Sequence, residues 1–259
     1  MKFIKKLLLS RSNSENLPST EAVSMVEEEI YKIFQKKFRI IFNNPALIIT
    51  AFKHRSYLNI TSENRIASNE RLEFLGDAVL DLVVTQYLYQ KFPKRTEGQL
   101  SKIKSILVSK PVLAEIASNL SFGEMILINK GEEKTGGRTR QSILSDAFEA
   151  VIGALYLDQG LDTAGAFIQQ YLITHFKSIM QRELFKNYKS ILLEYAQSKH
   201  GQLPEYQVLE EHGPDHDKRF VIAVFLKDEE IGQGRGRSKK IAEQEAAKTA
   251  LQNLGLDVS

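Results

Sequence analysis

The chain has 259 residues, enough for two ordinary domains, and its 42% hydrophobic content is sufficient for a buried core. It contains no cysteine, so disulfides and thiolate metal sites are excluded, and any metal must be held by oxygen or imidazole ligands. The formal net charge is only +3, and residues 189–259 carry 10 basic and 12 acidic side chains. Because no strongly basic domain stands out, a surface for nucleic acid has to be sought in local clusters.

Residues 1–22 are predicted to form a flexible extension. The opening MKFIKKLLLS begins like a signal peptide, but its apolar run is short and polar residues follow directly. Attachment to a membrane surface is the alternative for this segment. No later apolar run approaches the roughly 20 residues that span a bilayer. With no cysteine available for disulfides, we expect a cytoplasmic protein with no membrane partner.

The rest of the chain changes character near residues 185–190. In residues 23–186, apolar side chains recur mostly at helical spacing and glycines are confined to a few places, which predicts an all-α domain. Residues 189–257 show a helical pattern, three strand-like runs and an alanine-rich helical pattern. This order predicts a small α+β domain of the form α-β-β-β-α, about 70 residues long. The expected fold is therefore multidomain, with an all-α first domain and an α+β second domain.

An acidic row lies in the predicted helix at residues 69–84, NERLEFLGDAVLDLVV. At about 100° per residue, its four carboxylates share one face, while the rest of the circumference is apolar. They are Glu70, Glu73, Asp77 and Asp81. A solvated charged face is the ordinary explanation for such spacing. Here the face is narrow and no lysine or arginine on it balances the acids, so grouped carboxylates would be costly unless a cation neutralised them.

A second predicted helix at residues 145–158, SDAFEAVIGALYLD, repeats the arrangement. Asp146 and Glu149 are three residues apart, hence on one face, and Gly153 one turn later would let another helix come close. If the two acidic faces oppose each other, Glu73 and Asp77 join this pair in an all-oxygen site of the type that selects Mg²⁺ or Mn²⁺. Such ions commonly serve phosphoryl chemistry, because they activate water and stabilise the entering and leaving oxygens. We therefore expect a phosphate ester as substrate.

These two helices resemble a known family. NERLEFLGDAVLDLVV, together with GGRTRQSILSDAFEAVIGALYLD at residues 136–158, is similar to the catalytic domain of bacterial ribonuclease III. The C-terminal unit resembles the double-stranded-RNA-binding domain that follows it in that family. The resemblance implies metal ligation by Glu73, Asp146 and Glu149. It also implies that Asp77 and Glu149 are the residues called catalytic.

The same resemblance also implies roles for residues outside the set of metal ligands. Glu70 and Glu97 are placed near the cleavage site. Glu97 follows a proline-marked helix end, where a loop acid could approach the cluster directly or through water; an ordinary exposed loop glutamate is the alternative. Phe74 is placed at the interface of a homodimer, and core packing within one subunit is its alternative. Two active sites related by a two-fold axis would suit the cutting of both strands of a duplex.

A basic cluster precedes the last predicted helix. It consists of Arg235, Arg237, Lys239 and Lys240 around Ser238, a plausible N-cap. Lysines in a first helical turn oppose the macrodipole, but they suit a phosphate backbone lying across the helix start; a solvated basic loop is the alternative. Gln197, beside Glu194 on the first helix, and His216 between two strands resemble the family's contacts to the minor groove of RNA. Such contacts predict recognition by shape more than by sequence.

Two positions depart from the family pattern. Lys53 precedes His54 where threonine is usual, and Gln141 stands where proline is frequent. Neither is a metal-binding carboxylate, so we expect effects on packing or rate only. His54 could be a general base or a structural hydrogen-bonding histidine, and the second is favoured because water activated by a metal needs no imidazole.

The expected function is an endoribonuclease that hydrolyses phosphodiester bonds in double-stranded RNA with Mg²⁺, for which Mn²⁺ would substitute. By resemblance it leaves 5′-phosphate and 3′-hydroxyl ends and processes ribosomal precursors and other structured RNAs, messages included. One alternative is a non-catalytic double-stranded-RNA-binding protein, whose mark would be a lost acid, and this chain has lost none. Another is a phosphatase for small molecules, which leaves the C-terminal unit unexplained.

Overall fold

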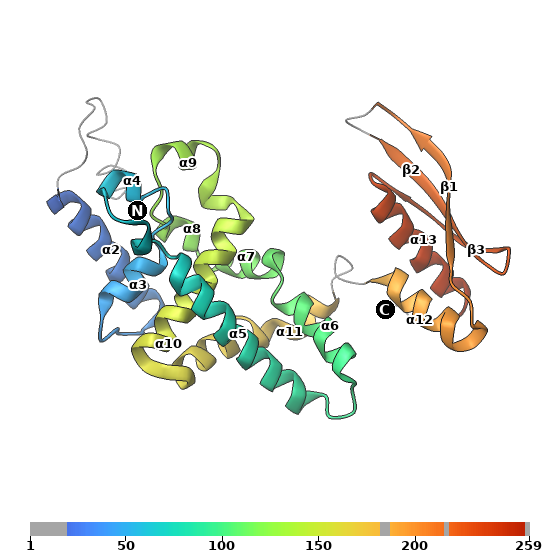
Figure 1. Ribbon diagram of the computed structural model, residues 1–259, viewed down its shortest axis with the longest axis horizontal. Coiled ribbons are helices and arrows are strands. Elements are labelled where there is room, and N and C mark those ends of the chain that lie inside the picture. The colour runs from blue at the N-terminus through green and yellow to red at the C-terminus, as the bar shows by residue number, and fades with distance from the viewer. Residues whose placement is uncertain (1–19, 182–186, 215–217, 257–259) are drawn as a thin grey trace. The chain divides into compact units, whose positions relative to one another are not determined.

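The computed structural model describes residues 20–181, 187–214 and 218–256, in two compact units that divide between Ile179 and Met180 (Figure 1). The described part of the first unit is helical, and the second has three strands and two helices. The expected fold class, all-α followed by α+β, is confirmed. No helix in these ranges is long and apolar enough to cross a membrane.

Three long helices form the frame of the first unit. They are α2 (Thr20–Phe38), α5 (Glu70–Lys91) and α10 (Gln141–Tyr171). The shorter helices are α3 (Pro45–Ala51), α4 (Leu58–Thr61), α6 (Glu97–Leu107), α7 (Lys110–Asn119), α8 (Phe122–Met125), α9 (Lys130–Lys134) and α11 (Phe176–Gln181), with 3-10 turns η1 (Arg65–Ala67), η2 (Gly137–Thr139) and η3 (Ile173–His175). Helix α2 begins three residues before residue 23, and residues 1–19 of the expected extension lie outside the described residues.

Helices α5 and α10 cross with their backbones in contact. A Cβ on Gly76 would lie 1.7 Å from the backbone oxygen of Glu149, and one on Gly153 would lie 2.2 Å from that of Leu72. Only glycine fits at either position without moving a helix. The close approach predicted at Gly153 is confirmed, and Gly76 is its counterpart on α5. This crossing brings the two acidic faces together.

A group of aromatic rings packs against α10 through Phe148. Phe34 and Phe38 come from α2, Phe122 from α8 and Phe148 from α10, with Phe52 after α3. Neighbouring centroids lie 4.5–6.2 Å apart, and the rings are tilted or edge-on. Each such pair contributes about 0.5–1.5 kcal/mol beyond the area it buries.

Lys53, at the family's threonine position, is a buried cation that is 7% exposed. Its Nζ lies 2.8 Å from Glu27 of α2 and 3.0 Å from Glu63. Burial works to lower the pKa of Lys53, but hydrogen bonds to the two carboxylates outweigh burial and raise it. The Lys53 carbonyl also accepts the N–H of Asn69 at 2.9 Å, directly before α5. Lys53 therefore joins α2 to the start of the acidic helix.

The second unit is an antiparallel sheet of order β1-β2-β3 covered by helices. Its elements are α12 (Tyr188–His200), β1 (Glu205–His212), β2 (Arg219–Leu226), β3 (Glu229–Gly236) and α13 (Lys239–Asn253). A Cβ on Gly234 would lie 2.1 Å from the backbone nitrogen of Ala246, so glycine lets α13 lie directly on β3. The apolar side chains of β2 and the alanines of α13 are buried as predicted; these are Phe220, Ile222, Val224, Leu226, Ala242, Ala246 and Ala250.

Candidate active site

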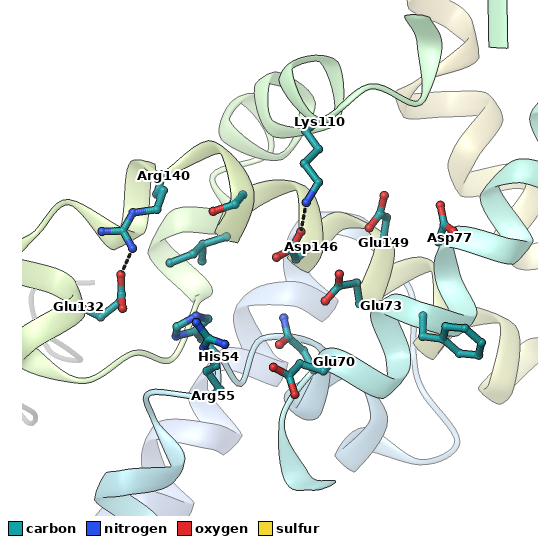
Figure 2. Close-up of a pocket in the computed structure, with 14 residues that line it drawn as sticks. His54, Arg55, Glu70, Glu73, Asp77, Lys110, Glu132, Arg140, Asp146 and Glu149 are labelled. Atoms are coloured by element: carbon teal, nitrogen blue, oxygen red, sulfur yellow. Dashed lines mark hydrogen bonds and ion pairs between the residues drawn. The ribbon is translucent and has the colours of Figure 1, made fainter. Parts of the chain in front are cut away.

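A pocket of about 740 Å³ lies where α5, α7 and α10 meet, and it contains the predicted acid cluster (Figure 2). Helix α5 contributes Glu73 and Asp77, and α10 contributes Asp146 and Glu149. Oxygens of Glu73, Asp146 and Glu149 all lie within 4.8 Å of one another. Asp77 lines the same pocket outside this group of three. The structure thus brings together acids from two helices that are far apart in the sequence.

Burial and like charge both act on this cluster. Burial, followed by the charges of Asp77, Glu73 and Asp146, raises the pKa of Glu149 to about 8. Burial, followed by the charge of Asp146, also raises the pKa of Glu73. Lys110 opposes both shifts, but its Nζ is 3.8 Å from Asp146 and its side chain is 68% exposed. One exposed ammonium does not balance the acids, so their oxygens fit a divalent cation.

Asp146 is held in place by its neighbour in the sequence. Ser145 is fully buried, and its hydroxyl lies 3.0 Å from the carbonyl oxygen of Ser142 and 3.2 Å from Oδ1 of Asp146. This contact limits the rotation of the carboxylate and leaves it aimed into the pocket. A ligand group oriented in this way is prearranged for a cation.

The remaining predicted acids have different surroundings. Glu70 lines the pocket and pairs with Arg65 at 3.2 Å, a hydrogen bond that lowers the pKa of Glu70. Asp81 lies outside the pocket, 2.7 Å from Lys104 of α6. Glu97 is also outside the pocket; the loop position expected for it is wrong, because it begins α6 and accepts a hydrogen bond from Ser101 at 2.7 Å. Of the acidic row, Glu70, Glu73 and Asp77 face the pocket.

The opposite wall of the pocket carries cations and polar groups that the sequence did not single out. Arg55 lines it, and Arg140 pairs there with Glu132, whereas Lys110 lies on the side of the acids, next to Asp146 (Figure 2). In this view His54 lies between the Arg140–Glu132 pair and the acids. Arg55 follows His54 directly, which could have drawn attention to it. Lys110 carried no such signal, because the fold alone brings the start of α7 to the acids.

Phe74 lines the pocket, and 81% of its surface is exposed. Core packing within one subunit, the alternative for this residue, is therefore wrong. A large apolar side chain with this much of its surface exposed to solvent is unusual beside a polar pocket.

In the second unit, the basic cluster is exposed at the start of α13. Arg235 lies next to the last residue of β3, Arg237 lies in the turn, and Lys239 and Lys240 occupy the first helical turn. Ser238 is the N-cap, as predicted, and accepts the N–H of Ile241 at 3.3 Å. Glu194 and Gln197 are exposed on α12, and His216 lies outside the described residues.

Comparison with known protein families gives one match for each of the two units. A family profile described as "Ribonuclease-III-like" matches residues 44–176, and one described as "Double-stranded RNA binding motif" matches residues 188–254. Curated proteins called Ribonuclease 3 are 50% identical in Geobacillus thermodenitrificans and 47% identical in Bacillus cereus, each over 226 residues. These alignments cover 86% and 87% of this chain and 91% and 92% of the relatives.

A solved nuclease domain gives a structural match. Ribonuclease III from Campylobacter jejuni, described as showing structural flexibility in a region involved in dimer formation, is 42% identical with a TM-score of 0.51. The match covers 56% of this chain and 96% of that chain. A ribonuclease-III-like domain joined to a double-stranded RNA binding motif defines an endoribonuclease. With half of its residues identical over most of both chains, the protein belongs to the ribonuclease III family.

Proposed function

We propose that this protein uses Mg²⁺ to hydrolyse phosphodiester bonds in double-stranded RNA, leaving 5′-phosphate and 3′-hydroxyl ends. The observation that supports this most directly is the set of three carboxylates with oxygens within 4.8 Å in one pocket. In this proposal the protein works in the cytoplasm on ribosomal precursors and other structured RNAs, and Mn²⁺ substitutes for Mg²⁺.

Each acid has a role that follows from its position. Glu73, Asp146 and Glu149 hold the cation, which when bound lowers the pKa of a water molecule and stabilises the entering and leaving oxygens of an in-line displacement. Asp77 lies beside them, where its carboxylate can accept a hydrogen bond from the attacking water. Glu70 lines the same pocket and would lie near the substrate. Glu97 would have to reach the substrate from outside this pocket.

The second unit supplies affinity for the duplex. Cations at the start of α13 meet phosphates together with free N–H groups, while Gln197 and His216 contact the minor groove. Replacing Lys239 and Lys240 with alanine should weaken binding and reduce the slope of log affinity against log salt by about one for each phosphate that is no longer neutralised. Lys227→Gln, in the β2–β3 turn at the other end of the strands, is the matched control. Unchanged salt dependence in the double variant would exclude this surface.

A homodimer is part of the proposal, because two strands require two sites. Phe74, Leu82 and Tyr89 share one side of α5 and are 81%, 53% and 74% exposed. A second copy of the chain would cover this apolar stripe. Phe74→Asp should give a monomer in sedimentation experiments, whereas Ile66→Asp, at another exposed apolar residue, should leave the dimer intact. A dimeric Phe74→Asp protein would remove α5 from the interface.

The nuclease proposal is tested by incubating the full chain with a long RNA duplex in Mg²⁺, in Ca²⁺ and in chelator. Cutting should require Mg²⁺, and binding should occur in all three. Glu149→Gln and Asp77→Asn should abolish cutting and leave binding intact. Asp81→Asn should cut normally, because Asp81 pairs with Lys104 outside the pocket. Duplex that is bound but uncut in Mg²⁺ would refute the proposal, and equal loss of both activities would argue against separate roles for the two units.

A further inference from the structure

His54 lines the pocket, and one of its ring nitrogens, Nδ1, faces Ser56 and is hydrogen-bonded there. Its Nδ1 accepts the backbone N–H of Ser56 at 3.2 Å and lies 2.9 Å from the Ser56 hydroxyl oxygen. That oxygen in turn accepts the N–H of Asn129 at 3.1 Å, so the hydroxyl hydrogen is free to point at Nδ1. Two hydrogens are therefore directed at Nδ1, and the proton of the neutral ring must be on Nε2.

The surroundings keep this ring neutral and leave Nε2 available. Burial is the main influence on the pKa of His54 and lowers it; the charges of Glu132 and Asp146 act against burial, and those of Arg55 and Arg140 act with it. Among the described residues, Nε2 has no hydrogen-bond partner, although His54 lines the pocket. The ring thus presents a single N–H donor of fixed direction to whatever enters.

We infer that His54 is an RNA-contacting residue whose Nε2–H donates a hydrogen bond to a backbone oxygen of the strand being cut, an inference that rests on the proposed nuclease function. The ligand must offer an acceptor, and an RNA backbone offers non-bridging phosphate oxygens and 2′-hydroxyl oxygens. A general base is the wrong role for this histidine. The lone pair that a base needs is on Nδ1, which faces Ser56, while Nε2 already carries its hydrogen.

Three variants separate the donor from other roles. His54→Phe keeps a flat ring without the N–H, His54→Gln places an amide N–H near the position of Nε2, and His175→Phe alters an exposed histidine elsewhere in the same unit. We expect His54→Phe to lower kcat/KM by about ten- to a hundredfold, because it removes one hydrogen bond to a charged or polar oxygen. His54→Gln should recover most of that loss, and His175→Phe should match the original protein. Mg²⁺ affinity should be unchanged in all three.

Two measurements keep the inference testable if His54→Phe folds poorly. A long-range ¹H–¹⁵N spectrum of the original protein should show His54 protonated at Nε2 and not at Nδ1. Cleavage of duplexes with a single 2′-deoxy or a single phosphorothioate substitution beside the cut site identifies the oxygen. The original protein should be slowed by one of these changes, and the His54→Gln protein should be slowed by the same one.

The inference and the nuclease proposal fail in different ways. Absence of cutting by the original protein refutes the nuclease proposal. Normal cutting by His54→Phe, His54→Gln as slow as His54→Phe, or a proton found on Nδ1 refutes the role of His54 alone. A substituted duplex that slows neither protein at any position beside the cut also refutes it.

Discussion

Replacing Gly76 with alanine should separate the two helices that carry the acids. The added Cβ would lie 1.7 Å from the backbone oxygen of Glu149, half of the 3.4 Å at which ordinary van der Waals contact begins. The obstacle is backbone, so no side-chain rotation relieves it. Helices α5 and α10 would therefore have to move apart by more than 1 Å, as a rough estimate for a tightly packed crossing.

The size of the effect follows from which atom is displaced. The oxygen in contact belongs to Glu149 itself, so any movement carries a ligand of the proposed cation away from Glu73. A displacement of about 1 Å costs roughly a hundredfold in rate at a positioned site. Overpacking also lowers the free energy of unfolding by about 1–3 kcal/mol. We expect Gly76→Ala to bind Mg²⁺ more weakly and to cut at least about a hundredfold more slowly.

The assays are single-turnover cleavage, calorimetric titration with Mg²⁺ and denaturant unfolding in chelator. Gly165→Ala is the matched control in α10, because its Cβ would meet Val83 at an ordinary 4.0 Å. That control should bind and cut normally and be as stable as the original protein, or more stable by up to about 1 kcal/mol. A Gly76→Ala protein that binds Mg²⁺ and cuts like the original would show that the close crossing does not assemble the site.

Without metal, the free energy of unfolding should fall as the pH rises from about 4.5 to about 8, because over this range Glu149 keeps its proton in the folded state and loses it in the unfolded chain. Unfolding in chelator at several pH values should show a shallower fall for Glu149→Gln, and an identical fall would contradict the assignment. Lys110→Ala should bind Mg²⁺ more tightly in calorimetry, since an ammonium repels a divalent ion more strongly than it repels a proton; weaker binding would overturn this. Lys53→Thr should lower the free energy of unfolding by about 3 kcal/mol, because it leaves Glu27 and Glu63 without their shared cation. A loss below about 1 kcal/mol would show that the buried ion pairs contribute little to stability.

The acid cluster was predictable because each half of it belongs to a single helix. The spacing of Glu73 and Asp77, and of Asp146 and Glu149, is fixed by helical geometry, and Gly153 marked where another helix could approach. The order of elements in the second unit was equally local, because strand alternation and the Ser238 cap are read within a few residues.

Pairings across the fold were not predictable in this way. Asp81 shares a face with the other acids, but Lys104, which neutralises it, comes from α6. Lys110 reaches the cluster only because α7 packs against α10. Glu97 is different, since its helix was signalled: Thr96 and Gln99 form a capping box, a pattern present in the sequence that the loop interpretation missed.

The acid cluster also makes catalytic activity and the stability of the metal-free protein conflicting requirements. Its carboxylates are gathered and half-buried in the fold itself, so the chain carries their mutual repulsion whenever the metal is absent. Substitution of Glu73 or Glu149 by a neutral residue would raise the free energy of unfolding of the metal-free protein and abolish RNA cleavage. Selection for cutting must therefore act continuously against mutations that selection for folding alone would favour. A descendant that kept only duplex binding should, over time, become more heat-resistant at this pocket.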